Sequence, residues 1–300
     1  MLESSTIVTY PRGDVRGNST VLMVSALRDD PDNVAIFVKE TPFHPVDYAW
    51  ADQPADKGTL SISGVEICVI RCLTAAIKAG TEEVFIDHEI TARRGDPDWY
   101  FLVAHIVERS TVDTLGDIIG APVELAVNEE YRRKLSETHT GCHLAALALN
   151  KATSGFWSKE IKRDSLGHPD LDSMTIANSK IDDICSTDTY RFGKSIRKKG
   201  LDVAGLLSGI ADIQSQVNGC LVEWLSVPLV FKIVPLLAFL AEARKWQCTL
   251  PEGLAEIPCG GTHLDELPER SGRIEVDLEI TDDRQGMVMR TTFSSLAAGK

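Results

Sequence analysis

The sequence of 300 residues lacks an uncharged apolar run long enough to cross a membrane. Its most apolar stretch, Leu221 to Ala243, is interrupted by Glu223, Lys232 and two prolines, whereas a span needs about 20 consecutive, predominantly apolar residues. The N-terminal residues MLESSTIVTYPRGD have no basic flank followed by an apolar run, so they do not resemble a secretion signal. We therefore expect a soluble, cytoplasmic protein without membrane association.

Low-complexity tracts and short-period repeats are also missing, which argues against a solenoid or a disordered chain. Seven cysteines in a chain of this length, without an export signal, do not suggest a disulfide framework. Most lie in apolar surroundings, and we expect Cys68, Cys72, Cys220 and Cys248 to be small core residues. Cys259 differs, because two glycines follow it directly.

Positive charge is scarce, and the formal net charge is −13. This balance is unfavourable for a protein that binds nucleic acid, since phosphate contacts usually come from clustered Lys and Arg. Two local basic clusters are present, Arg132-Arg133-Lys134 and the segment KSIRKK from Lys194 to Lys199. A solvated helix face explains each cluster better than phosphate binding does.

Strand-like runs alternate with turn signals over the first part of the chain. The runs are Ser19 to Ala26, Asn33 to Glu40, Val65 to Leu73, Val84 to His88 and Tyr100 to Val107. Short strands at this spacing predict a small barrel or sandwich. The pattern changes after Pro122, and we predict an α+β protein with a small N-terminal β-barrel over residues 1–125 and an α+β domain over residues 126–300.

A helix is predicted from Asn128 to Asn150. Asn128 is a suitable N-cap with two glutamates in the first turn. One apolar stripe recurs at three- and four-residue steps, through Leu135, Thr138, Cys142, Ala145 and Leu149. A second helix is predicted over Leu201 to Leu221, and a hairpin over Gly272 to Thr292.

Two histidines are four residues apart in the first predicted helix. His139 and His143 therefore share one helix face, where two imidazoles can bind one metal ion. Such a pair also occurs by chance, so it does not establish a site. The segment lacks the glutamate of the HExxH motif, which disfavours a zinc peptidase of that type.

A second segment offers two further ligands. In Pro258-Cys259-Gly260-Gly261-Thr262-His263 the adjacent glycines permit a tight turn, so that Cys259 and His263 can converge. Taken alone, a surface turn beside a buried cysteine explains it equally well. Together the two segments supply three imidazoles and one thiolate, a plausible tetrahedral set for Zn²⁺. Four ligands bound at once would resemble a structural site, whereas catalysis needs an open position.

The His-x-x-x-His motif followed by Cys-Gly-Gly-Thr-His resembles the editing domain of alanyl-tRNA synthetase and its free-standing relatives, the AlaX trans-editing proteins. Tyr190-Arg191-Phe192 resembles the family's Arg-Phe-Asp-Phe strand, although Gly193 stands where its Asp would be. The segment Ala211 to Asn218 resembles a helix of the family. The resemblance covers roughly Ala35 to Thr292, and it implies a metal-dependent hydrolase that removes wrongly attached amino acids from tRNA in trans.

The N-terminal part adds a second match. The segment Thr41-Pro42-Phe43-His44-Pro45 resembles the family's Thr-x-Phe-Tyr/His-Pro motif. It is followed by Gln53-Pro54 and then by Asp56-Lys57-Gly58, which resemble the end of the family's Gly-Gly-Gly-Gln-Pro loop and its Asp-x-Gly motif. The glycines of that loop are replaced by Trp50-Ala51-Asp52. The resemblance implies a substrate pocket that includes Thr41, Gln53 and His44. A hydrogen bond between Thr41 and a substrate hydroxyl would favour seryl over alanyl esters. The expected substrates are Ser-tRNA(Ala) and, after it, Gly-tRNA(Ala).

The implied partner is the acceptor end of tRNA, expected to be tRNA(Ala). The basic residues expected to contact it are Arg132, Arg133, Lys194, Arg197, Lys198 and Lys199. Two alternatives stay open: a zinc hydrolase of the same fold that acts on another aminoacyl-tRNA or on a small ester or amide, and a non-catalytic zinc-binding module. The motifs contain no carboxylate placed as a general base, since Glu137 precedes His139 by two positions and points off its face.

Overall fold

The computed structural model describes residues 4–295. Within them the fold is α+β, with mostly antiparallel sheets and six α-helices. Contacts divide the chain into two compact units. The first contains Met1–Arg133, Ile233–Arg244 and Cys259–Thr262, and the second contains Lys134–Lys232, Lys245–Pro258 and His263–Lys300. Among the described helices, none has the length and apolar character that crossing a membrane would require.

The first unit is built on an eight-stranded sheet with the order β6-β5-β10-β2-β3-β9-β7-β8. Its strands are β2 (Arg16–Ala26), β3 (Asn33–Val38), β5 (Gly58–Ile62), β6 (Val65–Val69), β7 (Arg71–Lys78), β8 (Val84–Ile86), β9 (Trp99–Glu108) and β10 (Pro122–Val127). The smaller elements are the parallel pair β1 (Ile7–Val8) and β4 (Glu40–Thr41), the helix α1 (Arg109–Asp113), and the 3₁₀ turns η1 (Tyr10–Arg12) and η2 (Asp87–Glu89). The predicted closed barrel is not confirmed, because the strand order of the described residues is open, with β6 and β8 at its edges.

The centre of this sheet is buried on both faces. Along β3, Val34, Ile36 and Val38 enter one apolar cluster, while Ala35 and Phe37 enter a second. Alternate residues of a strand point to opposite sides, so both sides are covered. The edge strand β6, in contrast, is buried on one face and exposed on the other.

Along β6, exposed and buried side chains alternate. This alternation places Cys68 beside Glu66 on the exposed face, so the prediction that Cys68 is a core residue is wrong. Cys72, Cys220 and Cys248 are buried as expected. The run Val65 to Leu73 was predicted as one strand, but it is divided between β6 and β7 at Ile70.

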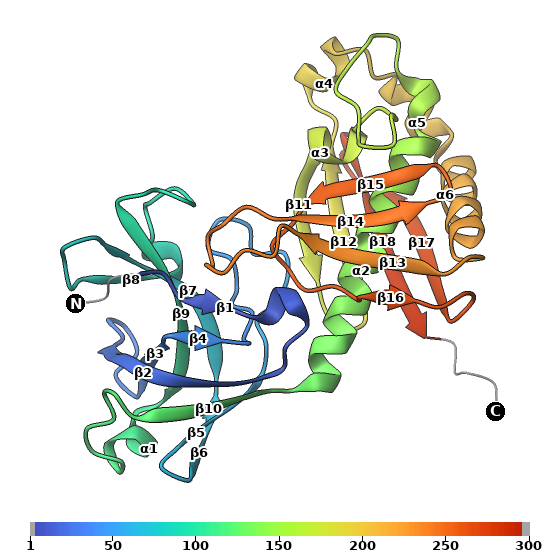
Figure 1. The fold of residues 1–300 in the computed structure, drawn as a ribbon. Coiled ribbons are helices and arrows are strands. Elements are labelled where there is room, and N and C mark those ends of the chain that lie inside the picture. Colours follow the sequence, from blue (N-terminus) through green and yellow to red (C-terminus); the bar gives the residue numbers. More distant parts are fainter. Residues whose placement is uncertain (1–3, 296–300) are drawn as a thin grey trace. The chain divides into compact units, whose positions relative to one another are not determined.

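The second unit contains two four-stranded sheets and most of the helices (Figure 1). One sheet has the order β11-β12-β18-β17, formed by β11 (Ile176–Ile181), β12 (Cys185–Arg191), β18 (Gly286–Ser295) and β17 (Gly272–Ile280). The other has the order β15-β14-β13-β16, formed by β15 (Gly253–Pro258), β14 (Lys245–Leu250), β13 (Leu229–Val234) and β16 (Glu266–Leu267). The helices are α2 (Glu129–Ala152), α3 (Leu171–Thr175), α4 (Lys194–Lys198), α5 (Val203–Ser208) and α6 (Ile210–Trp224), with the 3₁₀ turn η3 (Ser154–Phe156).

The predicted helix from Asn128 to Asn150 is confirmed as α2. Asn128 caps it as expected, because its Oδ1 accepts the backbone N–H of Tyr131 at 3.0 Å. The hairpin is confirmed as the pair β17–β18. The predicted helix from Leu201 to Leu221 is divided into α5 and α6 at Gly209.

Helix α6 covers the outer strand of one sheet, β17. The Asn218 side chain donates to the carbonyl of Val276 and accepts its N–H, both at 2.8 Å. The Gln214 amide oxygen accepts the N–H of Leu278 at 2.8 Å. Edge strands expose unpaired backbone groups, and these two amides satisfy three of those groups on β17.

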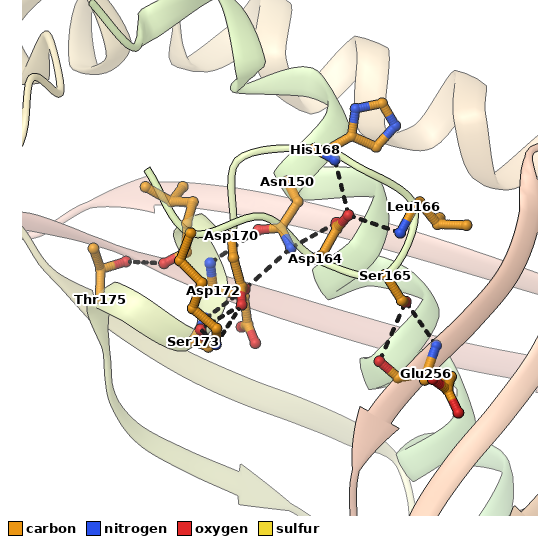
Figure 2. A network of polar contacts seen from close by, with 12 residues as sticks. Asn150, Asp164, Ser165, Leu166, His168, Asp170, Asp172, Ser173, Thr175 and Glu256 are labelled. Atoms are coloured by element: carbon orange, nitrogen blue, oxygen red, sulfur yellow. Dashed lines mark hydrogen bonds and ion pairs between the residues drawn. The ribbon is translucent and has the colours of Figure 1, made fainter. Parts of the chain in front are cut away.

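The end of α2 is tied to the loop that follows it, as Figure 2 shows. The Asn150 amide nitrogen donates to Asp164 at 3.1 Å and to Asp170 at 3.4 Å, and its oxygen accepts the N–H of Asp172 at 2.9 Å. Asp170 in turn caps α3 through the N–H of Ser173 at 3.2 Å. These bonds order a segment that the sequence presents only as polar and turn-rich.

Candidate metal centre

Helix α2 places His139 and His143 side by side, with ring centroids 4.7 Å apart. The apolar stripe of the helix packs into the core, and His139 is 1% exposed. His143 is half-buried, but its Nε2 is buried and has no hydrogen-bond partner among the described residues. Burial lowers the pKa of His143 to about 3, so the imidazole is neutral near pH 7 and carries a lone pair suited to a metal ion.

His263 completes a group of three imidazoles. Its ring centroid lies 4.2 Å from that of His139 and 4.8 Å from that of His143. The indole of Trp246, on β14, lies 5.2 Å from His143 and 5.9 Å from His263, and it is fully buried. Trp246 therefore covers one side of the histidines with apolar surface, a role that the sequence did not reveal.

Thr140 holds His263 in place. Its Oγ1 accepts the N–H of Leu264 at 3.1 Å and lies 3.3 Å from Nδ1 of His263. In the tautomer protonated at Nδ1, the imidazole donates to Thr140 and keeps the lone pair on Nε2. Such outer contacts commonly fix the orientation of a metal-binding histidine. Thr140, which directly follows His139 in the helix, thus has a supporting function of its own.

The Cys259 loop, residues 259–262, is held by its backbone. The Cys259 N–H donates to the carbonyl of Arg244 at 3.1 Å, and the Tyr10 hydroxyl donates to the carbonyl of Gly260 at 3.1 Å. The N–H of Gly261 donates to Cys259 Sγ at 3.3 Å. Burial raises the pKa of the Cys259 thiol to about 12, although the Gly261 N–H acts in the opposite direction.

The four predicted ligands lie together. One ligand atom from each of His139, His143, Cys259 and His263 can be chosen so that all four lie within 4.8 Å of one another. Bond lengths of about 2.0–2.3 Å at tetrahedral angles separate the ligand atoms of a zinc site by roughly 3.3–3.8 Å. The limit of 4.8 Å within which the four ligand atoms lie is about 1 Å wider than that spacing. The donor set and the unpartnered His143 nitrogen both fit a thiophilic divalent cation.

Gln53 is buried at 2% exposure and forms two hydrogen bonds with Thr262 of the Cys259 loop. Its placement as a residue that lines a substrate pocket stays a prediction. The contact with Thr262 was not foreseen, because 209 residues separate the two in sequence.

Thr41 is fully buried, and its hydroxyl is engaged. His105 Nδ1 lies 3.1 Å from the carbonyl oxygen of Ile36. A carbonyl can only accept a hydrogen bond, so Nδ1 is the protonated nitrogen and donates to it. Nε2 is then an acceptor, and the Thr41 hydroxyl donates to it at 2.9 Å while accepting the N–H of Phe43 at 3.2 Å. A substrate hydroxyl could therefore only donate to Thr41. Burial lowers the pKa of His105 to about 4, which keeps its imidazole neutral.

His44 belongs to a buried charged cluster of the first unit. Its N–H donates to Oδ2 of Asp56 at 2.5 Å, and its ring packs edge-on against Tyr10 at 5.0 Å. Burial lowers the pKa of His44 to about 4. Asp56 pairs with Arg132, whose Nε donates to Asp56 Oδ1 at 2.7 Å and whose Nη2 donates to the carbonyl of Pro42 at 2.7 Å.

Arg132, one of the residues expected to contact tRNA, forms a buried ion pair with Asp56, and its contact with tRNA stays a prediction. Arg132 is 5% exposed, and its guanidinium holds the Thr41–Pro45 segment through Pro42 and Asp56. Arg133, Lys194, Arg197, Lys198 and Lys199 are exposed. Arg197 donates to the carbonyl of Phe192 and to the side chain of Gln285, which anchors the short helix α4.

No family model matches this chain, and no curated protein matches it either.

Proposed function

We propose that this protein is a metal-dependent hydrolase that acts in the cytoplasm on the ester of wrongly charged aminoacyl-tRNA. The convergence of His139, His143, Cys259 and His263 within 4.8 Å carries the proposal. Neither sequence segment establishes a metal site alone, and the grouping of all four residues is what supports one. The likeness of both segments to the editing domain of alanyl-tRNA synthetase supplies the substrate class.

The metal that suits this donor set is Zn²⁺, because imidazole and thiolate are its preferred ligands. A bound Zn²⁺ would polarise an ester carbonyl and acidify a water molecule toward a pKa of ~7. Three or all four residues would hold it, and hydrolysis requires one position open to water or substrate.

The surrounding residues contribute orientation and shielding. Thr140 holds His263 through its hydroxyl, and Trp246 keeps bulk water from one side of the imidazoles. The Gly261 N–H stabilises negative charge on Cys259 Sγ. The pKa of His143 lies near 3, so protons do not compete for its ligand nitrogen at pH 7.

Ser-tRNA(Ala) is the proposed substrate, with Gly-tRNA(Ala) second, and free-standing editing implies action in trans. A deacylation panel tests this directly. The full-length protein is incubated with Ser-, Gly- and Ala-tRNA(Ala) and with an unrelated mischarged tRNA, with and without a chelator. We expect chelator-sensitive release of serine first. Turnover of none of these esters by metal-loaded protein would overturn the proposal.

A matched pair of cysteine variants separates the site from general effects. Cys259→Ala should abolish deacylation, whereas Cys68→Ala, at an exposed position on β6, should leave it unchanged.

A second candidate, a non-catalytic zinc-binding module, is favoured by the presence of four protein ligands. His143→Ala distinguishes the two roles. A folded but inactive variant supports catalysis, and unfolding with loss of metal supports a structural role.

A further inference from the structure

We propose that Gln53 is a positioning residue for the metal centre, acting through Thr262 to hold the Cys259 loop in the geometry that binds the ion. The inference rests on the metal centre of the proposed function. It assigns Gln53 a task different from contact with the substrate.

The contact is specific in both directions. Gln53 Oε1 accepts the backbone N–H of Thr262 at 3.0 Å, and Gln53 Nε2 donates to Thr262 Oγ1 at 2.8 Å. A planar amide that forms two bonds with one residue fixes both the distance and the orientation of that residue. Both side chains are buried, at 2% and 4% exposure, so water does not compete for these groups.

Thr262 is the position at which this control is most effective. It directly precedes His263 and lies three residues after Cys259, with Gly260 and Gly261 between them. Glycine loses more conformational freedom on folding than any other residue. The Gly-Gly segment therefore needs external bonds to hold the two ligands at a fixed spacing.

Those bonds are distributed along the loop. The Arg244 carbonyl holds the N–H of Cys259, and Tyr10 holds the carbonyl of Gly260. Gln53 supplies side-chain contacts to the far end of the loop, next to His263. Without Gln53, the spacing between Cys259 and His263 would be less well defined, and the affinity for the ion would fall.

Gln53 is itself ordered before it reaches Thr262. Pro54 restricts the preceding residue to extended backbone conformations. The N–H of Gln53 donates to Oδ1 of Asp52 at 2.8 Å. Asp52, which stands where the alanyl-tRNA synthetase editing domain has a glycine, thus helps to fix the backbone of Gln53.

Metal affinity tests the inference without any tRNA. Zinc dissociation constants are measured on the folded full-length protein by competition with a chromophoric chelator. Gln53→Ala should weaken zinc binding by about 10- to 100-fold, the range for loss of a residue that supports a metal ligand. Gln285→Ala, a glutamine that bonds Arg197 in another part of the fold, should leave it unchanged.

Thr262→Val provides a second variant that keeps the backbone N–H and removes the hydroxyl. It should weaken binding less than Gln53→Ala does. The double variant should bind about as weakly as Gln53→Ala alone, since both changes remove the same contact.

An unchanged zinc affinity in folded Gln53→Ala would overturn the inference, as would fully additive losses in the double variant. If the wild-type protein binds zinc with the expected dependence on Gln53 but hydrolyses no aminoacyl-tRNA, the proposed function fails and the positioning role stands.

Discussion

Replacing Arg132 with methionine should cost a large part of the stability of the first unit. The side chains of Arg132 and Asp56 are 7% and 0% exposed, and two hydrogen bonds join them. Methionine fills similar volume but leaves the Asp56 carboxylate buried without its counter-charge. Removal of one partner from a buried ion pair typically costs about 3–5 kcal/mol, against a total stability on the order of 5–15 kcal/mol.

Urea denaturation followed by tryptophan fluorescence and circular dichroism measures the loss. Arg93→Met is the matched control, because Arg93 is exposed and an exposed substitution changes stability by about 0.5 kcal/mol or less. In Arg132→Met/Asp56→Asn the charge left behind is also removed, so part of the loss should be recovered. An Arg132→Met variant as stable as Arg93→Met would refute the reasoning, as would a double variant less stable than Arg132→Met.

Two further predictions concern the second unit. Burial and the charge of Asp188 raise the pKa of Asp172 to about 7, so its contribution to stability is complete below pH ~4 and is lost as the pH rises through 7. The free energy of unfolding of the wild type should therefore decline by about 2–3 kcal/mol between pH 5 and pH 8. Asp172→Asn, which can still accept the hydrogen bond of the Tyr190 hydroxyl, should not show this decline. The same decline in urea titrations of the variant would argue against a buried carboxylate there. Asn218→Ala should lower the free energy of unfolding by about 1–3 kcal/mol, because it leaves backbone groups of β17 unpaired. Gln216→Ala, at an exposed position, should be neutral. Equal urea midpoints for the two variants would count against the role of Asn218 in capping the edge strand.

The sequence was informative where the determining contacts are local. The cap at Asn128 and the apolar stripe of α2 both depend on residues that are only three or four positions apart. They predicted the helix and the shared face of His139 and His143. The Cys259 loop could be foreseen in the same way, because Cys259, the two glycines and His263 lie within five consecutive residues.

Features that depend on distant partners could not be foreseen. A run of basic residues looks alike whether it faces solvent or a buried acid, and the partner of Arg132 is 76 residues away. Closure of a barrel depends on which strands meet at the edges, and alternation within each strand carries no such information. The supporting contacts of Trp246 and Gln53 belong to this group as well.

Metal content is the most direct test of the central claim. Full-length wild-type protein, Cys68→Ala and His143→Ala/Cys259→Ala are analysed by elemental mass spectrometry after dialysis against metal-free buffer. We expect one zinc ion per chain in the wild type and in Cys68→Ala, and none in the double variant. Stoichiometric zinc in the double variant, or folded wild-type protein that takes up no zinc when it is supplied, would contradict a metal centre at His139, His143, Cys259 and His263.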